Sequence, residues 1–581
     1  MCSLIAAIIV VAYSPTLNAD FVWDDKIIFH DTAWFRGNGN WFGMLLHGFP
    51  EWRNYFRPLG LMLFSCEARL FGVNAMPFHA VSIALHVANA FVLSRLAKVW
   101  FPSDVKPLWV PAFAMLFYGL HPTLIEPVSW IAAQCDLLAT LLVFVGLLIN
   151  ARVNRVAWRA VLLGVCCLSG LLVKESAAAL PLLVVVSDWY VRTSRGRSFL
   201  ESAVSLLRSN LASYVVLFGV VVIYGVLRHL ILGGTGFSMA SPTLMRHVQT
   251  VAFLYMKYWQ LVVSPATHLS PMHTVPTVDL DHASAITTMY CIAALLLLLA
   301  GLVGALLRNA VGILILGTTT GMLSVLHLLP VDFDESLYHE RYTIIAIAFF
   351  AAFFPTVLKS LAVRTTDIAI RVAAVAVGTV WLIASVAMVR AIVPMWKNDV
   401  TFWQWAWRNE PTSVSTMDHL MAAYIDAKRL PEARGMAAQV LRQQTSCVTC
   451  LLNIAYLAIR DGDTQQAESA VEQAGVQIAQ SQPSKMIAFE YIRTIGDLRQ
   501  LQKEPEVAEA AYRDAISTDP FNPDGYFSLA LLLAHQGRLD EAQATMQKVR
   551  ELSAADDLQE RIAVFEQVAG KQRLKNEDVP N

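Results

Sequence analysis

Cys291-Ile-Ala-Ala-Leu-Leu-Leu-Leu-Leu-Ala-Gly-Leu-Val-Gly-Ala-Leu-Leu307 is an apolar stretch without a single charged side chain. A helix needs about 20 mainly apolar residues to cross the hydrocarbon core of a bilayer. Similar runs occur at 137–149, 210–227 and 343–354, all in the first two thirds of the chain. The sequence therefore predicts an all-α protein whose larger part is a bundle of transmembrane helices.

Composition divides the chain near Pro394. Only 15% of the 581 residues are charged, whereas soluble proteins carry about 25%. The shortage is confined to the part before Trp396, and the chain beyond it is rich in Ala, Gln, Glu and Arg. We predict a membrane domain over 1–395 and a soluble domain over 396–581. Residues 1–19 lack the basic flank and cleavage site of a signal peptide, so we expect a retained first helix.

Eleven spans account for the apolar runs. The segment 157–190 is too long for one span, because a helix of its 34 residues would extend about 50 Å at 1.5 Å per residue. Lys174-Glu175 interrupts it, which favours a hairpin of two short helices. The predicted spans are 2–19, 76–97, 108–121, 134–150, 157–173, 176–190, 210–230, 284–306, 309–329, 343–362 and 367–393.

Basic loops orient this bundle. With a cytoplasmic N-terminus, the eleven spans place every cluster of Lys and Arg on the cytoplasmic face, as the positive-inside rule requires. The longer loops and the soluble domain then lie on the non-cytoplasmic side, which is the periplasm in a bacterium and the ER lumen in a eukaryote. The clusters are Arg95, Lys98 and Lys106; Arg152, Arg155 and Arg159; Arg192, Arg195, Arg197 and Arg208; Arg308; and Lys359, Arg364 and Arg371.

Four short segments recur at nearly fixed spacing in the soluble part. We interpret them as equivalent turns that lead into a second helix. Each ends in an alanine, and these alanines are separated by 34, 41 and 34 residues: Ala433, Ala467, Ala508 and Ala542. Thirty-four residues is the tetratricopeptide period. The excess of seven predicts a longer helix or loop around 475–490. Such arrays stack their repeats and bind other chains without chemistry of their own.

Cys447-Val-Thr-Cys450 opens the second repeat. Two cysteines spaced i, i+3 on an oxidising face can form a disulfide, and a lone CxxC also binds metals or transfers electrons. No second CxxC or pair of histidines lies nearby in the sequence, which disfavours a zinc site. We expect a structural or adventitious disulfide.

Short polar motifs recur in the segments assigned to the non-cytoplasmic face. Ionisable residues at membrane depth cost about 2.5–3.5 kcal/mol each, so they usually mark function. Interfacial anchoring is the alternative for any single one of them. The motifs are Phe21-Val-Trp-Asp-Asp25, Tyr55-Phe-Arg-Pro58, His121-Pro-Thr-Leu-Ile-Glu-Pro-Val-Ser-Trp130, Gln134-Cys-Asp136, Lys174-Glu175, Asp332-Phe-Asp334 and Tyr338-His-Glu-Arg-Tyr342.

Together these motifs suit the transfer of a group from an anionic lipid to a hydroxyl. A carboxylate can accept the hydroxyl proton, and Arg or Lys can neutralise the departing phosphate. Because adjacent Asp24 and Asp25 must point in different directions, one should face the substrate while the other caps, orients or binds a cation. The candidates are the carboxylates Asp24, Asp25, Glu126, Asp136, Glu175 and Glu340, the cations Arg57, Lys174 and Arg341, and the histidines His121 and His339.

The ordered motifs, followed by tetratricopeptide repeats, resemble the transmembrane-and-tetratricopeptide (TMTC) protein O-mannosyltransferases over nearly the whole chain. The resemblance implies a GT-C fold and an inverting enzyme that takes a sugar from a polyprenyl-phosphate donor. In those enzymes an acidic residue of the first external loop is the general base, which corresponds here to Asp24, with Asp25 beside it. By their charge and side, Arg57, Lys174 and Arg341 would hold the donor phosphate.

We therefore expect a multi-pass membrane glycosyltransferase that moves a sugar, mannose or another, to a protein Ser/Thr hydroxyl bound by the repeats. Two alternatives stay open: a transferase with the same donor that acts on a lipid or surface polysaccharide, and a non-catalytic membrane-anchored repeat scaffold. No cofactor is certain; Asp24, Asp25 and Glu126 are the candidate ligands if a divalent cation takes part. The expected partners are a polyprenyl-phosphate-linked sugar, an acceptor protein or peptide and membrane lipid, with no nucleic acid.

Overall fold

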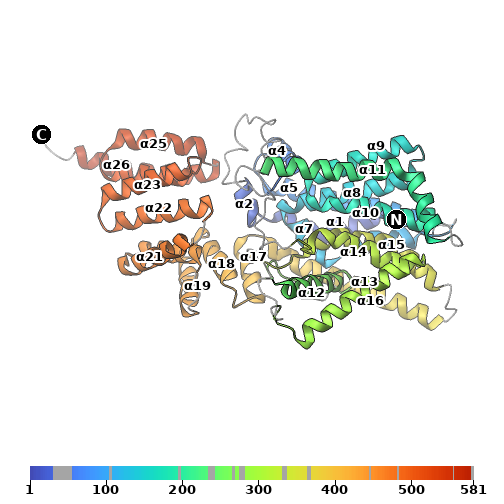
Figure 1. Ribbon diagram of the computed structural model, residues 1–581. Coiled ribbons are helices and arrows are strands. Elements are labelled where there is room, and N and C mark those ends of the chain that lie inside the picture. The colour runs from blue at the N-terminus through green and yellow to red at the C-terminus, as the bar shows by residue number, and fades with distance from the viewer. Residues whose placement is uncertain are drawn as a thin grey trace. The chain divides into compact units, whose positions relative to one another are not determined.

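Helices make up the regular structure of the protein. Figure 1 shows its computed structural model. The model describes residues 1–29, 55–103, 107–193, 198–232, 243–264, 269–273, 280, 282–329, 336–362, 368–443, 447–480, 483–553 and 555–577. Within these ranges every regular element is an α-helix or a 3₁₀-helix and none is a strand. The predicted all-α class is confirmed for this part of the chain.

The chain divides into two compact units. The first comprises Met1–Val22 and Asn40–Asn398, and the second comprises Trp23–Gly39 and Asp399–Asn581. The short segment around Asp24 and Asp25 therefore packs with the second unit, although it precedes most of the first unit in the sequence.

The first unit contains the apolar helices. Seven helices among the described residues are long and apolar enough to cross a membrane: Ala75–Trp100, Ile131–Arg152, Val156–Val173, Phe199–Leu232, Ala285–Leu306, Glu340–Leu361 and Ile368–Trp396. Each coincides with a predicted span. Three further spans correspond to shorter apolar helices, Cys2–Asn18, Trp109–Gly119 and Ala310–Val325, and one to α10 (Leu180–Arg192). Multiple crossing is thus supported by helix length and composition, and the count of eleven stays a prediction.

The predicted break at Lys174 is confirmed. Helix α9 (Val156–Val173) ends immediately before it, and Lys174 itself is extended with φ −160° and ψ 142°. A 3₁₀ turn, η5 (Glu175–Ala179), then leads into α10. The break places two ionisable side chains between helices rather than within one.

Hydrogen bonds join several of the predicted basic loops to one another. Arg192 donates to the backbone carbonyl of Asn150 at 2.7 Å, and Arg308 donates to Thr193 Oγ1 at 3.1 Å. Lys359 donates to the carbonyl of Pro102 at 2.6 Å. These links fit the prediction that the basic loops share one face of the bundle.

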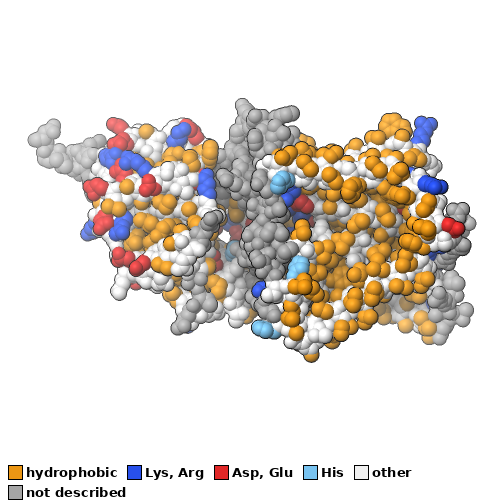
Figure 2. Space-filling model, in the orientation of Figure 1, with side chains coloured by type: hydrophobic (Ala, Val, Ile, Leu, Met, Phe, Trp, Pro, Cys, Tyr) orange, Lys and Arg blue, Asp and Glu red, His pale blue; other side chains and the backbone are white. Residues whose placement is uncertain are grey.

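Large apolar side chains remain exposed along the flank of the first unit, which is predominantly hydrophobic in Figure 2. Phe218 on α11 (Phe199–Leu232) is 71% exposed, and Val375 on α16 (Ile368–Ile392) is also 71% exposed. Leu296 on α13 (Ala285–Leu306) is similarly open. Soluble proteins rarely expose contiguous apolar patches of this kind, so the flank suits contact with lipid tails.

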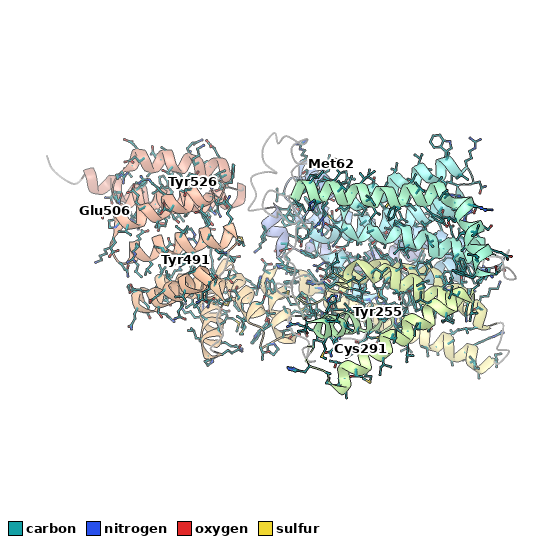
Figure 3. All side chains as sticks on the ribbon, viewed as in Figure 1. Met62, Tyr255, Cys291, Tyr491, Glu506 and Tyr526 are labelled. Carbon is teal, nitrogen blue, oxygen red and sulfur yellow. A yellow bond between two sulfur atoms is a disulfide. The ribbon has the colours of Figure 1, made fainter. Side chains whose placement is uncertain are left out.

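Paired helices build the second unit, and Figure 1 shows the later ones stacked side by side. The seven-residue excess between repeats is taken up by two long helices, α21 and α22, as predicted. In Figure 3, Tyr491 on α22 reaches toward α21, where a Cβ on Gly475 would come within 2.4 Å of its hydroxyl. The helices are α17 (Asp399–Asn409), α18 (Val414–Asp426), α19 (Leu430–Arg442), α20 (Val448–Asp461), α21 (Thr464–Gln480), α22 (Lys485–Leu501), α23 (Pro505–Thr518), α24 (Pro523–His535), α25 (Leu539–Leu552) and α26 (Ala555–Glu577).

The four predicted turns share one backbone geometry. The residue immediately before each turn segment has a positive φ, between 58° and 80°. The alanine at the end of each segment is fully buried against the neighbouring helix. Equivalent backbone conformation and equivalent burial at the same spacing confirm the repeat register. The positive-φ residues are Lys428, Gly462, Lys503 and Gly537, and the alanines are Ala433, Ala467, Ala508 and Ala542.

Two glycines allow a test of this register. Gly462 ends α20 with φ 73°, whereas Gly435 lies inside α19 with no atom near the position of an added Cβ. We expect Gly462→Ala to destabilise α20 and α21 by about 1 kcal/mol, because only glycine adopts a left-handed φ without cost. Gly435→Ala should instead stabilise α19 by about 0.5–1 kcal/mol. Native-state hydrogen exchange of the full chain measures both changes, and equal signs for the two would contradict the register.

Candidate active site

Three cation–carboxylate pairs lie where helices of the first unit begin or end. Arg57 donates from Nε and Nη2 to Glu175 Oε2 at 3.0 and 2.8 Å. Lys174 Nζ donates to Asp136 Oδ2 at 2.5 Å. The structure thus pairs these four candidate residues directly, over sequence separations of 118 and 38 residues.

The third pair joins Arg341 to Glu126. The guanidinium of Arg341 donates to one carboxylate oxygen, and its backbone N–H donates to the other at 2.9 Å. Nδ1 of His339 lies 3.6 Å from the same carboxylate. Glu126 is therefore held from three directions, and its side chain is 5% exposed.

Helix ends bring these residues together. Arg57 precedes α4 (Pro58–Phe71), and Asp136 lies in the first turn of α8 (Gln134–Arg152). Close approach of the two helices depends on Gly60, because a Cβ there would come within 2.7 Å of Cys135 Sγ. Glu126 lies on α7 (Ile125–Ser129) and Arg341 on the 3₁₀ turn η7 (Glu340–Thr343), while Lys174 and Glu175 lie at the break between α9 and α10.

Aromatic rings line the same cluster. The guanidinium carbon of Arg341 lies 4.7 Å from the ring centre of Trp130 and 4.9 Å from that of Tyr342. Lys174 Nζ is 6.0 Å from the centre of the Tyr342 ring. Arg57 lies over Tyr55 at 4.2 Å. Such rings favour cations and exclude water, so the charged groups of the cluster lie in partly apolar surroundings.

Glu340 belongs to a neighbouring hydrogen-bond network. Its Oε1 accepts from the backbone N–H of Ser270 at 3.0 Å and lies 2.9 Å from Nε2 of His273. His273 stacks on Tyr338 with ring centres 4.0 Å apart, and Lys257 Nζ lies 5.6 Å from that ring. Glu340 is thus buried and oriented by protein groups.

Burial and neighbouring charges shift the ionisation of these groups. Burial alone would lower the pKa of Arg57, but the Glu175 carboxylate beside it reverses the effect and leaves that pKa raised. Burial lowers the pKa of the Lys174 ammonium, with Arg57 and Arg341 adding to the shift and Asp136 opposing it. Burial raises the pKa of Glu126, an effect that the Arg341 charge opposes.

Two residues of the cluster were not predicted from the sequence. Arg228, near the end of α11, lies 3.9 Å from Glu175 Oε1, and His273 lies against Glu340. A charged residue inside an apolar helix is itself a sign of function, so Arg228 could have been found on that ground. His273 follows a segment with no regular periodicity, and the sequence holds no comparable signal for it.

His121 has structural partners. Its Nε2 lies 3.1 Å from the backbone oxygen of Val262 on α12 (Leu244–Val263). Its ring packs against Phe117 and Trp381, with centres 5.1 and 5.6 Å away. Tyr255, labelled in Figure 3, joins α12 to α14 (Ala310–Met322) through Thr319 Oγ1 at 2.7 Å. These contacts fix α12 within the first unit.

Asp24 and Asp25 lie in the first turn of α2 (Asp24–Phe29), which is part of the second unit. Acidic residues suit this position because the N-terminus of a helix carries partial positive charge. Asp25 is 1% exposed, whereas Asp24 is half-buried. The two carboxylates are therefore unequal, and Asp24 is the more accessible.

Asp399 holds this turn in place. One oxygen accepts from the backbone N–H of Trp23 at 2.8 Å, and the other pairs with Lys26. The indole of Trp23 lies 6.0 Å from the ring of Phe402 and 5.9 Å from that of Trp403, both on α17. The Trp-Asp-Asp motif is thus anchored to α17 within the second unit.

A group with three potential metal ligands occurs once among the residues that the structure describes. It consists of Asp418, Cys447 and Cys450, whose ligand atoms lie within 4.8 Å of one another. The two cysteines are joined in a disulfide, as predicted from the sequence. The carboxylate of Glu126 is occupied by Arg341. The Asp332-Phe-Asp334 motif lies outside the described residues.

Comparison with known proteins links the chain to the family suggested by its motifs. It is 26% identical over 219 residues to protein O-mannosyl-transferase Tmtc1 of Drosophila melanogaster, covering 36% of this chain and 25% of that protein. It is 28% identical over 145 residues to protein O-mannosyl-transferase TMTC2 of Mus musculus, covering 23% and 17%. The chain thus aligns with a quarter or less of the length of these relatives. Similarity at this level supports a TMTC-like protein.

Further comparisons concern a repeat family and helical proteins. Residues 511–544 match the tetratricopeptide repeat family. A stretch of 88 residues is 38% identical to cellulose synthase operon protein C of Xanthomonas axonopodis, covering 15% of this chain and 5% of that protein. The crystal structure of yeast Tom70 aligns with 85% of this chain and 96% of its own at 11% identity, with a TM-score of 0.25. A score this low does not distinguish one helical fold from another.

Proposed function

We propose that the protein is a membrane glycosyltransferase that moves a sugar from a polyprenyl-phosphate donor to a Ser or Thr hydroxyl of a protein. The observation that carries the proposal is the buried charge of the first unit. Among the described residues, the cluster at the helix ends pairs four cations, Arg57, Lys174, Arg228 and Arg341, with the carboxylates Glu126, Asp136 and Glu175. Cations gathered in this way suit the binding of an anionic phosphate.

The proposed chemistry is the one that the resemblance to the TMTC O-mannosyltransferases implies. The acceptor oxygen attacks the anomeric carbon, the bond from that carbon to the phosphate oxygen breaks, and the configuration inverts. Asp24 accepts the hydroxyl proton as general base. Arg57, Lys174 and Arg341 stabilise the charge that develops on the leaving phosphate. Asp25, which is buried, orients the turn that carries Asp24.

Similarity to the named O-mannosyl-transferases supports mannose as the sugar and protein as the acceptor. The tetratricopeptide repeats would bind the acceptor chain, since stacked repeats present extended concave surfaces. The positive-inside pattern of the basic loops supports transfer on the non-cytoplasmic face.

Binding of the lipid carrier tests the proposal. The full-length protein in lipid nanodiscs should retain polyprenyl phosphate in native mass spectrometry and should not retain the uncharged polyprenol of equal length. Lys174→Gln should weaken retention of the phosphate about tenfold or more, since a charge-assisted hydrogen bond contributes about 1.5–3 kcal/mol. If both lipids are retained equally, the proposed phosphate-binding site is ruled out. A non-catalytic membrane-anchored scaffold would then be favoured.

The pH dependence of this binding should report Lys174. Its ammonium binds phosphate only when protonated, and its pKa is lowered by burial. Binding should therefore fall as the pH rises through that lowered pKa, below the value of about 10.4 at which an ordinary lysine titrates. Lys174→Arg, which stays protonated, should remove the fall. An unchanged pH profile in Lys174→Arg would assign the dependence to another group.

A further inference from the structure

The Cys447–Cys450 disulfide of the second unit has two unequal sulfurs. Cys447 caps α20 and is half-buried, whereas Cys450, one turn later, is fully buried. The backbone N–H of Cys450 donates to Cys447 Sγ at 3.1 Å. Thiol–disulfide exchange requires an incoming thiolate to reach one sulfur while the other leaves. Because Cys450 is buried, the sulfur of Cys447 is the accessible one.

A buried carboxylate accompanies the pair. Asp418 on α18 has an oxygen within 4.8 Å of both sulfurs. Its carboxylate accepts from Thr449 Oγ1 and, at 2.9 Å, from Asn453 Nδ2, both on α20. Burial raises the pKa of this carboxyl. A buried acid this close to the pair can supply a proton to a departing thiolate, so the arrangement suits chemistry at the sulfurs.

We propose that Cys447 and Cys450 form a thiol–disulfide exchange site for dithiol substrates, with Cys447 attacked and Asp418 carrying the proton. The site belongs to the second unit alone and does not rest on the proposed transferase activity.

The exchange proceeds in two balanced steps. A substrate thiolate, its proton released to solvent, attacks Cys447 Sγ; the Cys447–Cys450 bond breaks, and Cys450 leaves as a thiolate that takes the proton of Asp418. The second substrate thiol gives its proton to Asp418 and attacks the substrate sulfur of the mixed disulfide, which releases Cys447 as a thiolate that is protonated by solvent. The substrate dithiol is oxidised to a disulfide and the cysteine pair is reduced. Oxidised glutathione, a disulfide oxidant, reverses the change through the same bonds.

Glutathione tests the site in the full-length protein. Peptide mapping by mass spectrometry, after thiols are trapped with maleimide, reports the Cys447–Cys450 bond across a series of reduced-to-oxidised glutathione ratios. We expect the pair to pass from oxidised to reduced within the series. In Cys450→Ser, oxidised glutathione should form a mixed disulfide at Cys447, whereas Cys447→Ser should leave the buried Cys450 unmodified.

Asp418→Asn tests the proton carrier. It should slow reduction by dithiothreitol roughly tenfold to a hundredfold, a loss typical of removing a general acid. Asp461→Asn is the matched control, since Asp461 is an exposed carboxylate at the other end of α20, and it should leave the rate unchanged. If Asp418→Asn fails to fold, the glutathione series on the unaltered protein still decides the proposal.

Two results would overturn it. A disulfide that stays oxidised throughout the glutathione series would be a structural cross-link. Reduced protein that retains one zinc ion per chain, and loses it in Asp418→Asn, would instead make these residues a metal site.

Discussion

Arg341→Leu should destabilise the first unit by about 3–5 kcal/mol, the usual cost of leaving one partner of a buried ion pair uncompensated. Arg341 and Glu126 are 10% and 5% exposed and share two hydrogen bonds. The variant leaves the Glu126 carboxylate buried without the guanidinium. Thermal unfolding of the full-length protein in detergent measures the change. Arg95→Leu, which removes an exposed cation over Phe91, is the matched control and should change little.

A double variant separates packing from chemistry at the same pair. Glu126→Leu with Arg341→Met replaces both charges by apolar groups, a change that is often neutral or stabilising. We expect stability to return while retention of polyprenyl phosphate stays lost. If the double variant binds the lipid like the unaltered protein, Arg341 serves the fold and not the phosphate.

Asp24→Asn should lower the rate of sugar transfer by about 10²–10⁴-fold, the usual contribution of a general base. Asparagine keeps the size of the side chain and suits a helix start, so α2 and the anchoring of Trp23 by Asp399 should persist. Transfer is measured as kcat at saturating donor, alongside thermal stability. Undiminished transfer would remove Asp24 from the mechanism.

Two neighbouring carboxylates serve as comparisons for Asp24. Asp25→Asn alters a group that is 1% exposed, so it should lower thermal stability as well as transfer. Asp20→Asn alters an exposed side chain four residues earlier, and it should leave both quantities unchanged. Equal losses of transfer in Asp20→Asn and Asp24→Asn would point to a general effect of charge.

Local patterns predicted the elements of this fold well. The apolar runs located the long helices, and Lys174-Glu175 located the break between α9 and η5 because charge interrupts a span. The spacing of Ala433 and its equivalents located the repeats because a fixed period implies one repeated packing unit. Shorter helices such as α6 (Trp109–Gly119) fall below the length of a full span, and the sequence alone did not separate them from the longer ones.

Local sequence patterns do not predict which residues contact one another within the candidate site. Nothing local indicates that Arg57 binds Glu175, or that Arg228 approaches the same carboxylate, because these contacts depend on how distant helices pack. The inequality of Asp24 and Asp25 was predicted from backbone geometry, but which of them is buried depends on the packing of α2. The sequence gives no indication of a role for Asp418, because this residue lies close to the cysteines only when α18 and α20 pack together.

Sugar transfer by the purified full-length protein is the direct test of the proposed glycosyltransferase activity. The protein in lipid nanodiscs would receive radiolabelled polyprenyl-phosphate mannose and a peptide rich in Ser and Thr. We expect label to pass to the peptide hydroxyls while an equal amount of polyprenyl phosphate is released. Label that passes only to lipid or polysaccharide would contradict the protein acceptor. No transfer from mannose, glucose or N-acetylglucosamine donors, in protein that still binds polyprenyl phosphate, would contradict the enzyme itself.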